Sequence, residues 1–234
     1  MNLKKNNMKE IIIVGAGGSG MDVICIINSI NKIKNEWKIL GFLDDNSELL
    51  GEEIMGYRVL GNIEDGKEYS DAYFVSSIAN PTNRIVRKQV FNRIKKYTNN
   101  FATIIHPSVI IYEDVDIGLG TVINAGCILG SKVRLGTNVH VGYGCNIAHE
   151  TIINDNVSMG SGVNLSSGVI IGVNCYIGAG VSSTHDICVD ENILVTVGSS
   201  IVTNLKRNIY DTWIGTPAIS LKEFMRNKIV LKKQ

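Results

Sequence analysis

The 234-residue sequence predicts an α/β Rossmann-like N-terminal domain followed by an all-β domain wound as a three-sided parallel coil. Two observations support this fold class. A six-residue repeat runs without interruption from Ile105 to Lys206. Before it, apolar runs alternate with helix-like segments around a glycine-rich loop. We expect boundaries at 9–104 for the Rossmann-like domain, 105–218 for the coil and 219–234 for a C-terminal tail.

The repeat places an aliphatic residue at every sixth position, with Ser183 as the one polar exception. A period of six matches neither the roughly 3.6 of a helix nor the roughly 2.0 of a strand. It fits a coil of three short strands in which the aliphatic side chains point inward, glycine permits the turns and residues 18 apart stack at roughly 4.8 Å. The aliphatic series is Ile105, Ile111, Ile117, Ile123, Leu129, Leu135, Val141, Ile147, Ile153, Met159, Leu165, Ile171, Ile177, Val189, Val195 and Ile201, and glycines recur at Gly118, Gly130, Gly136, Gly142, Gly160, Gly172 and Gly178.

The first hundred residues alternate between strand and helix signals. Apolar runs occur at 10–14, 39–43, 57–60, 72–78 and 101–105, and helices are expected at 21–34 and 82–97. A continuous apolar run such as 11–14 is typical of a strand buried on both faces. The alternation predicts a small parallel sheet flanked by helices.

The first expected strand leads into a glycine-rich loop. Gly15-x-Gly17-x-x-Gly20 lies between a strand and a helix, and Asp44 and Asp45 follow the second strand, where a ribose-binding acid is expected. Glycines let the backbone approach a diphosphate, and the helix N-terminus supplies free N–H donors. Since the domain provides only about half of a dinucleotide fold, a nucleotide sugar is favoured over NAD. A third interpretation is that the glycine-rich loop is only a tight strand-to-helix turn and binds no ligand.

Composition excludes several classes of protein. The formal net charge is +1 and the basic residues are dispersed, so no nucleic-acid partner is indicated. No apolar run is long enough for a membrane helix and the N-terminus is polar, so we expect a cytoplasmic protein without a membrane partner. Five cysteines without a CxxC pattern favour reduced thiols over a disulfide framework or a zinc site, and Cys127, Cys145 and Cys175 occupy inward positions of the repeat.

Two of the four histidines are candidates for a general base. His149 and His185 occupy the same corner position of the repeat, 36 residues apart, which is two coils or about 10 Å along the axis. Glu150 follows His149 and could hold one ring nitrogen, leaving the other free to accept a proton. His185, beside Asp186, is the competing candidate. Structural roles are expected for the other two histidines, His106 and His140.

Together these features resemble the bacterial nucleotide-amino-sugar N-acetyltransferases of the PglD type, over about residues 9–218. The sialic-acid O-acetyltransferases of the NeuD type share the layout. The resemblance rests on the hexapeptide series, the glycine loop, the paired acids Asp44 and Asp45, the Ala148-His149-Glu150 triplet and the segment 213–218. It alone implies that the coil is a left-handed β-helix, that the protein is a homotrimer and that acetyl-CoA is the acetyl donor, without a metal.

The resemblance also assigns site residues. His149 becomes the general base and Glu150 its orienting acid, while the backbone N–H of Ser167 faces the thioester oxygen. Ser158, Ala179 and Gly198 lie beside the pantetheine arm. The substrate-binding residues are Gly15, Gly17, Gly18 and Ser19 at the diphosphate, Asp44 and Asp45 at the nucleoside, and Ala79 and Asn80 beside the nucleotide. The chain departs from the family at Ser19 and Ser158, where histidine is common.

The expected function is therefore acetyl-CoA-dependent N-acetylation of a nucleotide-linked amino sugar, in the biosynthesis of cell-surface glycans or glycoprotein sugars. Two alternatives remain at this point: O-acetylation of a sugar such as sialic acid, and a non-catalytic hexapeptide protein that serves in assembly. The sequence leaves open whether the nucleotide is UDP, TDP or GDP and whether the amine is on C3 or C4.

Overall fold

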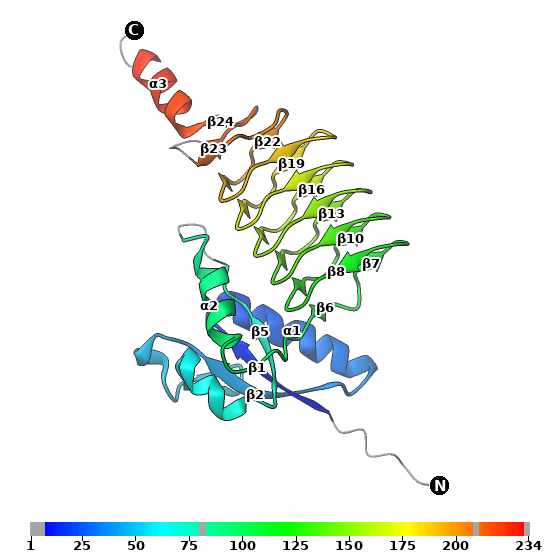
Figure 1. Ribbon diagram of the computed structural model, residues 1–234, viewed down its shortest axis with the longest axis vertical. Coiled ribbons are helices and arrows are strands. Elements are labelled where there is room, and N and C mark those ends of the chain that lie inside the picture. Colours follow the sequence, from blue (N-terminus) through cyan, green and yellow to red (C-terminus); the bar gives the residue numbers. More distant parts are fainter. Residues whose placement is uncertain (1–7, 80–82, 208–210, 232–234) are drawn as a thin grey trace.

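The structure is a computed structural model that describes residues 8–79, 83–207 and 211–231, with side chains up to residue 226. It confirms the predicted fold class. A mixed α/β domain lies at one end, and a left-handed parallel β-helix rises from it as a stack of triangular coils (Figure 1). The C-terminal helix α3 (Leu221–Leu231) lies at the far end of the stack.

The N-terminal sheet has the strand order β3-β4-β2-β1-β5, parallel except for the β3–β4 hairpin. Its first strand is buried on both faces, since Ile11 and Ile13 pack with α1 and Ile12 and Val14 pack with α2. This explains the continuous apolar run. The elements are β1 (Lys9–Val14), α1 (Gly18–Ile33), β2 (Trp37–Leu43), a 3₁₀ turn (Ser47–Leu49), β3 (Glu53–Ile54), β4 (Tyr57–Gly61), a second 3₁₀ segment (Ile63–Tyr69), β5 (Tyr73–Ser76) and α2 (Val86–Ile94).

The apolar run at 101–105 does not form one more strand of this sheet. Phe101 makes a single parallel bridge to Phe74, and Ile104–Ile105 instead becomes β6, the first strand of the β-helix. The run therefore joins the two domains. The run at 57–60 forms β4 as predicted, whereas its hairpin partner β3 was not predicted, because its two residues are too few to show a periodic pattern.

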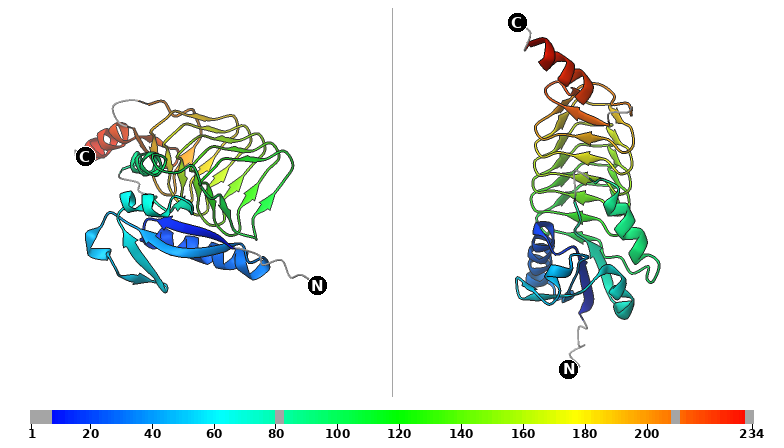
Figure 2. Two further views of the ribbon diagram at one scale, coloured as in Figure 1. Left: turned by 60° about the horizontal axis from the view of Figure 1, so that its bottom comes forward. Right: turned by 90° about the vertical axis from the view of Figure 1, so that its left-hand side faces the viewer.

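The β-helix consists of three sheets, one on each side of the prism, and all strand pairs are parallel except the last pair of the third sheet (Figure 2). The first contains β7 (Ile110–Ile111), β10 (Ile128–Leu129), β13 (Asn146–Ile147), β16 (Asn164–Leu165), β19 (Ser182–Ser183) and β22 (Ser200–Ile201). The second contains β8 (Asp116–Ile117), β11 (Arg134–Leu135), β14 (Ile152–Ile153), β17 (Ile170–Ile171) and β20 (Cys188–Val189). The third contains β6, β9 (Val122–Ile123), β12 (His140–Val141), β15 (Ser158–Met159), β18 (Tyr176–Ile177), β21 (Leu194–Val195), β23 (Thr212–Ile214) and β24 (Ile219–Ser220).

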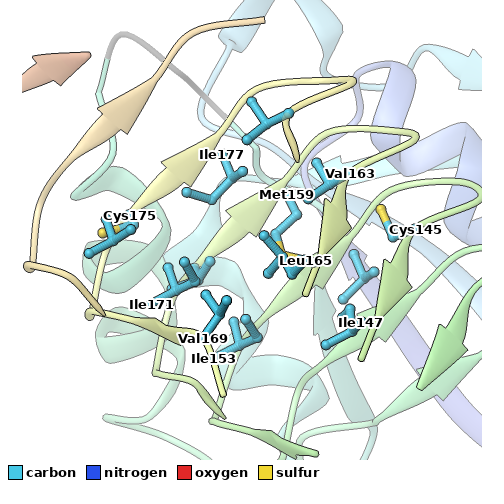
Figure 3. Packing of buried hydrophobic residues seen from close by; sticks show 14 of the residues in the cluster. Cys145, Ile147, Ile153, Met159, Val163, Leu165, Val169, Ile171, Cys175 and Ile177 are labelled. Atoms are coloured by element: carbon cyan, nitrogen blue, oxygen red, sulfur yellow. The ribbon is translucent and has the colours of Figure 1, made fainter. Parts of the chain in front are cut away.

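The aliphatic residue of each repeat points into the prism, as predicted (Figure 3). Side chains such as Ile147, Met159 and Ile177 are at most 1% exposed, and each contributes about 1.5–3 kcal/mol of burial free energy. The first coil is less protected because no coil lies beneath it, so Ile111 is 43% exposed. At the other end Trp213 packs against the core and covers it.

The role predicted for the recurring glycines is wrong. The left-handed backbone conformation occurs three residues after the aliphatic position, at every sixth residue from Asp114 to Gly198, and asparagine, aspartate, lysine and glutamate occupy it as well as glycine. The glycine that directly follows the aliphatic residue instead makes room for the next coil. A Cβ on Gly130, for example, would lie 2.6 Å from the backbone nitrogen of His149. Spacing between coils, not turn formation, requires these glycines.

Two substitutions separate these roles. In Gly172→Ala the new Cβ would lie 2.6 Å from the nitrogen of Glu191, so the free energy of unfolding should fall by about 1–3 kcal/mol or more. Gly162 has φ +68° and open space around it, and asparagine already occupies the equivalent positions 156 and 174. Gly162→Asn should therefore change the free energy of unfolding by less than about 0.5 kcal/mol. Urea denaturation measures both, and equal losses would contradict the assignment.

Candidate active site

The glycine loop has open backbone where an anion could approach. Gly15 has φ +102° and its N–H donates to the Leu43 carbonyl at 2.9 Å. Gly20 lies against the loop itself, since a Cβ there would be 2.4 Å from the Gly15 oxygen. Gly17 and Gly18, by contrast, have nothing within 4 Å of an added Cβ, and α1 begins at Gly18. The N–H groups of Gly17 and Gly18 make no hydrogen bond to a described residue, so these two are available to a diphosphate.

The two acids after β2 have partners within the chain. Asp44 accepts hydrogen bonds from the N–H of Ala16 at 2.8 Å and of Asn46 at 2.9 Å, so it fixes the glycine loop. Asp45 is bound by both terminal nitrogens of Arg93, at 2.6 and 3.0 Å. Arg93 also binds Glu64, and these charge-assisted hydrogen bonds lower the pKa of both Asp45 and Glu64. Both acids lie at the loop, but their carboxylates already have partners.

A cavity of about 310 Å³ opens beside these residues. Gly15, Asp44 and Asp45 form one side, and Gln89 and Arg93 of α2 form the other. The volume is at the lower end of the range for ligand pockets, about 300–1,000 Å³. Sequence reasoning missed Gln89 and Arg93, because only the folded arrangement brings α2 next to the end of β2.

A second cavity, of about 200 Å³, lies between the two domains. Ser19 and Ala79 line it from the N-terminal domain, and Ser158 lines it from the β-helix. Across its rim the Tyr143 hydroxyl donates to the Asp22 carboxylate at 2.8 Å. The structure thus brings together three residues that the sequence assigned to different parts of the ligands. Asn80, assigned beside Ala79, lies outside the described residues.

Two buried ionisable side chains, Arg87 and His140, lie where the two domains meet. Arg87 of α2 is 1% exposed, and it donates from Nε to the Asn138 carbonyl and from Nη1 to the Ile78 carbonyl, both at 2.6 Å. Burial lowers the pKa of Arg87 to about 9. His140 is 7% exposed, and burial together with the nearby Arg87 charge lowers the pKa of His140 to about 3. His140 is therefore neutral near pH 7.

The predicted base lies on an exposed corner of the prism. The Nδ1 atom of His149 is 3.1 Å from Oε2 of Glu150, and the His149 side chain is 59% exposed. With a proton on Nδ1 donated to the carboxylate, Nε2 is left as an acceptor. Lys132, one coil below, is 3.4 Å from Oε1 of Glu150. The hydrogen bond with His149, followed by Lys132, lowers the pKa of Glu150. Lys132 was missed, although its 18-residue offset from Glu150 pointed to it.

His185 has the same local geometry, because its Nδ1 lies 2.9 Å from Oδ2 of Asp186. A groove of about 320 Å³ on the face of the first sheet is lined by Ala148 near His149 and by Ser182 and Ser183 near His185. Neither histidine side chain lines this groove, and both are exposed. The local geometry therefore does not choose between the two histidines; the resemblance noted in the sequence favours His149.

The remaining predicted residues lie on different corners. Ser167 is one coil above His149, and the His149 carbonyl accepts from the neighbouring Gly168 N–H at 3.1 Å. Ala179 and Gly198 lie on the corner that joins the third sheet to the first, where the Gly198 N–H donates to the Ala179 carbonyl at 2.9 Å. His149 lies on the corner between the first and second sheets. One chain therefore does not bring His149 together with Ser158, Ala179 and Gly198.

Among the described residues, no helix has the length and apolar character needed to cross a membrane. The same part of the chain holds no group of three or more histidine, cysteine, aspartate or glutamate side chains arranged for a metal ion.

Comparison with known proteins supports the resemblance inferred from the sequence. Residues 10–94 match the family described as the PglD N-terminal domain. The UDP-N-acetylbacillosamine N-acetyltransferase of Bacillus subtilis is 30% identical over 116 residues, which are 49% of this chain and 50% of that protein. The chain thus aligns with about half the length of this curated relative.

Solved structures extend the likeness to both domains. The acetyltransferase domain of PglB from Neisseria gonorrhoeae is 24% identical, with a TM-score of 0.80 over 91% of this chain and 100% of that one. PerB from Caulobacter crescentus, in complex with CoA and GDP-perosamine, is 20% identical, with a TM-score of 0.76 over 90% of this chain and 96% of that one. These matches confirm the two-domain fold.

The buried state of His140 predicts a specific acid sensitivity. Its folded-state pKa of about 3 lies below the ordinary value of about 6.5, so between these values the unfolded chain binds a proton that the folded chain does not. The free energy of unfolding should therefore be unaffected by this group above about pH 6.5 and fall by about 1–2 kcal/mol between pH 6.5 and 5.

Urea denaturation of the wild type and of His140→Phe at several pH values tests this. In the variant, the free energy of unfolding should no longer show this fall between pH 6.5 and 5. Its decrease at lower pH should remain, because that decrease comes from carboxylates with a lowered pKa, such as Asp45. Parallel curves for the two proteins between pH 6.5 and 5 would contradict the assignment.

Proposed function

We propose that this chain, whose residues 10–94 belong to the PglD N-terminal domain family, transfers the acetyl group of acetyl-CoA to the amine of a nucleotide-linked amino sugar. The curated relative is named as an N-acetyltransferase. Structures of similar fold are described with acetyl coenzyme A, or with CoA and GDP-perosamine. The observation that carries the proposal is the exposed imidazole of His149, which has one nitrogen beside Glu150 and the other available.

The nucleotide would occupy the cavity beside the glycine loop. Gly17 and Gly18 would present N–H groups to the diphosphate, Gly15 would border it, and Arg93 would add positive charge. Because Asp44 binds the loop and Asp45 binds Arg93, we assign them to shaping this pocket as well as to bordering the nucleoside. Ser19 and Ala79 would then border the sugar, together with Asn80.

In the reaction, the neutral amine nitrogen attacks the thioester carbonyl carbon. Nε2 of His149 takes the proton that the nitrogen loses, the C–N bond forms, and the C–S bond breaks to release CoA thiolate, which recovers the proton. Glu150 holds the ring by Nδ1 and stabilises the imidazolium. The Ser167 N–H makes no hydrogen bond to a described residue, so it is available to the developing oxyanion.

The distribution of these residues supports a homotrimer. His149 and the residues proposed to bind the pantetheine arm, Ser158, Ala179 and Gly198, lie on different parts of one prism. A neighbouring copy that presents its own corner would complete the site, and closed cyclic symmetry suits a three-sided prism. The outward faces also expose isoleucines suited to subunit contact, Ile110 and Ile128 on the first sheet and Ile152 and Ile170 on the second, each 37–51% exposed.

We further propose that the enzyme acts in the cytoplasm, in the supply of sugars for glycans or glycoproteins. All five cysteines are free thiols, which fits a reducing compartment. We propose the substrate class rather than a single sugar.

Replacing His149 tests the assigned base. His149→Ala should lower kcat for a nucleotide amino sugar by about 10²–10⁴-fold, since that is the usual contribution of a general base. Its thermal midpoint should stay within about 2 °C of the wild type, because the side chain is exposed. Mass detection of acetylated product from UDP- and GDP-linked amino sugars gives the rate. His185→Ala is the matched control and should keep wild-type turnover.

Full activity in His149→Ala together with loss in His185→Ala would move the base to His185. Acetylation of free sialic acid, with no product from any nucleotide amino sugar, would replace the proposed reaction by O-acetylation. An inability to bind acetyl-CoA in calorimetry would leave a non-catalytic role in assembly.

Subunit mixing tests whether the site is shared. His149→Ala and Ala179→Trp should each inactivate the homotrimer, the second by blocking the proposed pantetheine path. In trimers reassembled from an equal mixture, about a quarter of the sites would combine an intact His149 with an intact neighbouring Ala179, so about a quarter of wild-type activity should return. Size-exclusion chromatography confirms reassembly. Trimers that form but recover no activity would show that each subunit uses its own two corners.

A further inference from the structure

The cavity between the domains has a polar floor that includes two side chains without a role in the proposed reaction, His140 and Asn124. His140 and Asn124 line it from the third sheet, together with Ser158, which is directly opposite His140 in the strand pairing. Ser19 of the glycine loop and Ala79 after β5 line the other side. The cavity therefore begins at the loop proposed to hold the diphosphate and ends at the β-helix.

Three buried atoms on this floor lack hydrogen-bond partners among the described residues. They are Nδ1 and Nε2 of His140 and Oδ1 of Asn124. His140 is 7% exposed and Asn124 is fully buried, so bulk water does not compensate them. Buried polar atoms in folded proteins nearly always have partners, and each one left without a partner lowers stability. A group that brings complementary hydrogen-bonding atoms would satisfy them.

Asn124 can be compared with an equivalent residue elsewhere in the β-helix. Its Nδ2 donates to the Val141 carbonyl at 3.0 Å, and Asn154, at the same position of another repeat, donates to the Ile171 carbonyl at 2.8 Å. The amide oxygen of Asn154 is not among the buried atoms without partners. Asn154 is only partly buried, so the two asparagines share a repeat position and differ in the burial of the amide oxygen.

The chemistry of the lining indicates what would bind. Neutral imidazole offers one donor and one acceptor, the amide oxygen of Asn124 is an acceptor, and the hydroxyls of Ser19 and Ser158 can do either. Among the described residues, the lining contains no lysine or arginine, and the carboxylate of Asp22 is bound by Tyr143. A phosphate would thus find no positive charge here. A volume of about 200 Å³ corresponds to roughly seven waters, enough for a single sugar ring.

We infer that His140 and Asn124 are specificity-determining residues that bind hydroxyl groups of the acceptor sugar. The inference rests on the proposed function, because Ser19 belongs to both the glycine loop and the cavity, so that a nucleotide held by the loop can extend its sugar onto this floor. His140 acts here as a neutral hydrogen-bonding side chain, and His149 remains the base.

The test compares binding of a nucleotide with and without its sugar. Calorimetry measures the Kd of GDP and GDP-perosamine, and of UDP and a UDP-linked 4-amino sugar, for each protein. His140→Phe should weaken binding of the nucleotide sugar at least about tenfold, because a site built to hydrogen-bond a hydroxyl loses that discrimination with the bond. Binding of the free nucleotide should change by less than about twofold. His140→Gln, which keeps a donor and an acceptor, should recover most of the loss.

The asparagine pair provides the matched control. Asn124→Ser and Asn154→Ser remove the same side-chain bond to a carbonyl, but only the first removes an atom of the cavity floor. Asn124→Ser should weaken binding of the nucleotide sugar but not of the free nucleotide, and Asn154→Ser should leave both affinities unchanged. This comparison stands by itself if His140→Phe does not fold, which circular dichroism would show.

Several outcomes would overturn the inference. Equal weakening of nucleotide and nucleotide sugar would assign His140 to the general fold, and a selective loss of acetyl-CoA affinity would assign the floor to the donor. Either result leaves the proposed function standing. A wild-type protein that binds acetyl-CoA but no nucleotide sugar would end both the inference and the proposed function.

Discussion

Backbone hydrogen bonding between successive coils is the constraint on which the rest of the molecule depends. Donors bond to carbonyls 17 residues onward, as the His140 N–H does to the Val157 carbonyl at 2.9 Å. This ladder leaves no space for a Cβ at positions such as Gly130 and requires a left-handed residue at each corner. In return, it sets side chains in vertical columns. Lys132 lies below Glu150, and Ser167 lies above His149, because each pair is 18 residues apart.

The second determinant is the way the N-terminal domain covers the third sheet. The buried Arg87 guanidinium links carbonyls of both domains, and an ion pair between Arg84 and Asp211 adds a contact farther along the stack. Figure 1 and Figure 2 both show α2 beside the lower coils. This contact buries His140 and leaves the cavity next to it. The glycine loop therefore faces one side of the prism, while the His149 corner is remote from it in the same chain.

Sequence reasoning recovered the features that a fixed period determines. It predicted the inward column, the stacking by 18, the glycine loop and the pairing of His149 with Glu150. It failed where the outcome depends on contacts between parts distant in sequence. Arg93 reaches Asp45 only after α2 packs on the sheet, and His140 is buried only because another domain covers its strand. The glycines were misassigned because a repeat shows where a small residue recurs but not which neighbour demands it.

The uncovered first coil has a consequence for how the column comes apart. Within the β-helix each coil contacts only the one above and the one below, so apart from the face that the N-terminal domain covers it behaves as a linear array whose stability is a sum of nearest-neighbour terms. Ile111 is half open to water at one end, whereas Trp213 shields the other. Fraying should therefore begin at the first coil, and amide hydrogen exchange should slow within one or two coils above it. Glu150 and its imidazole partner lie above the fraying coils, in a part of the β-helix that stays ordered while the first coil opens.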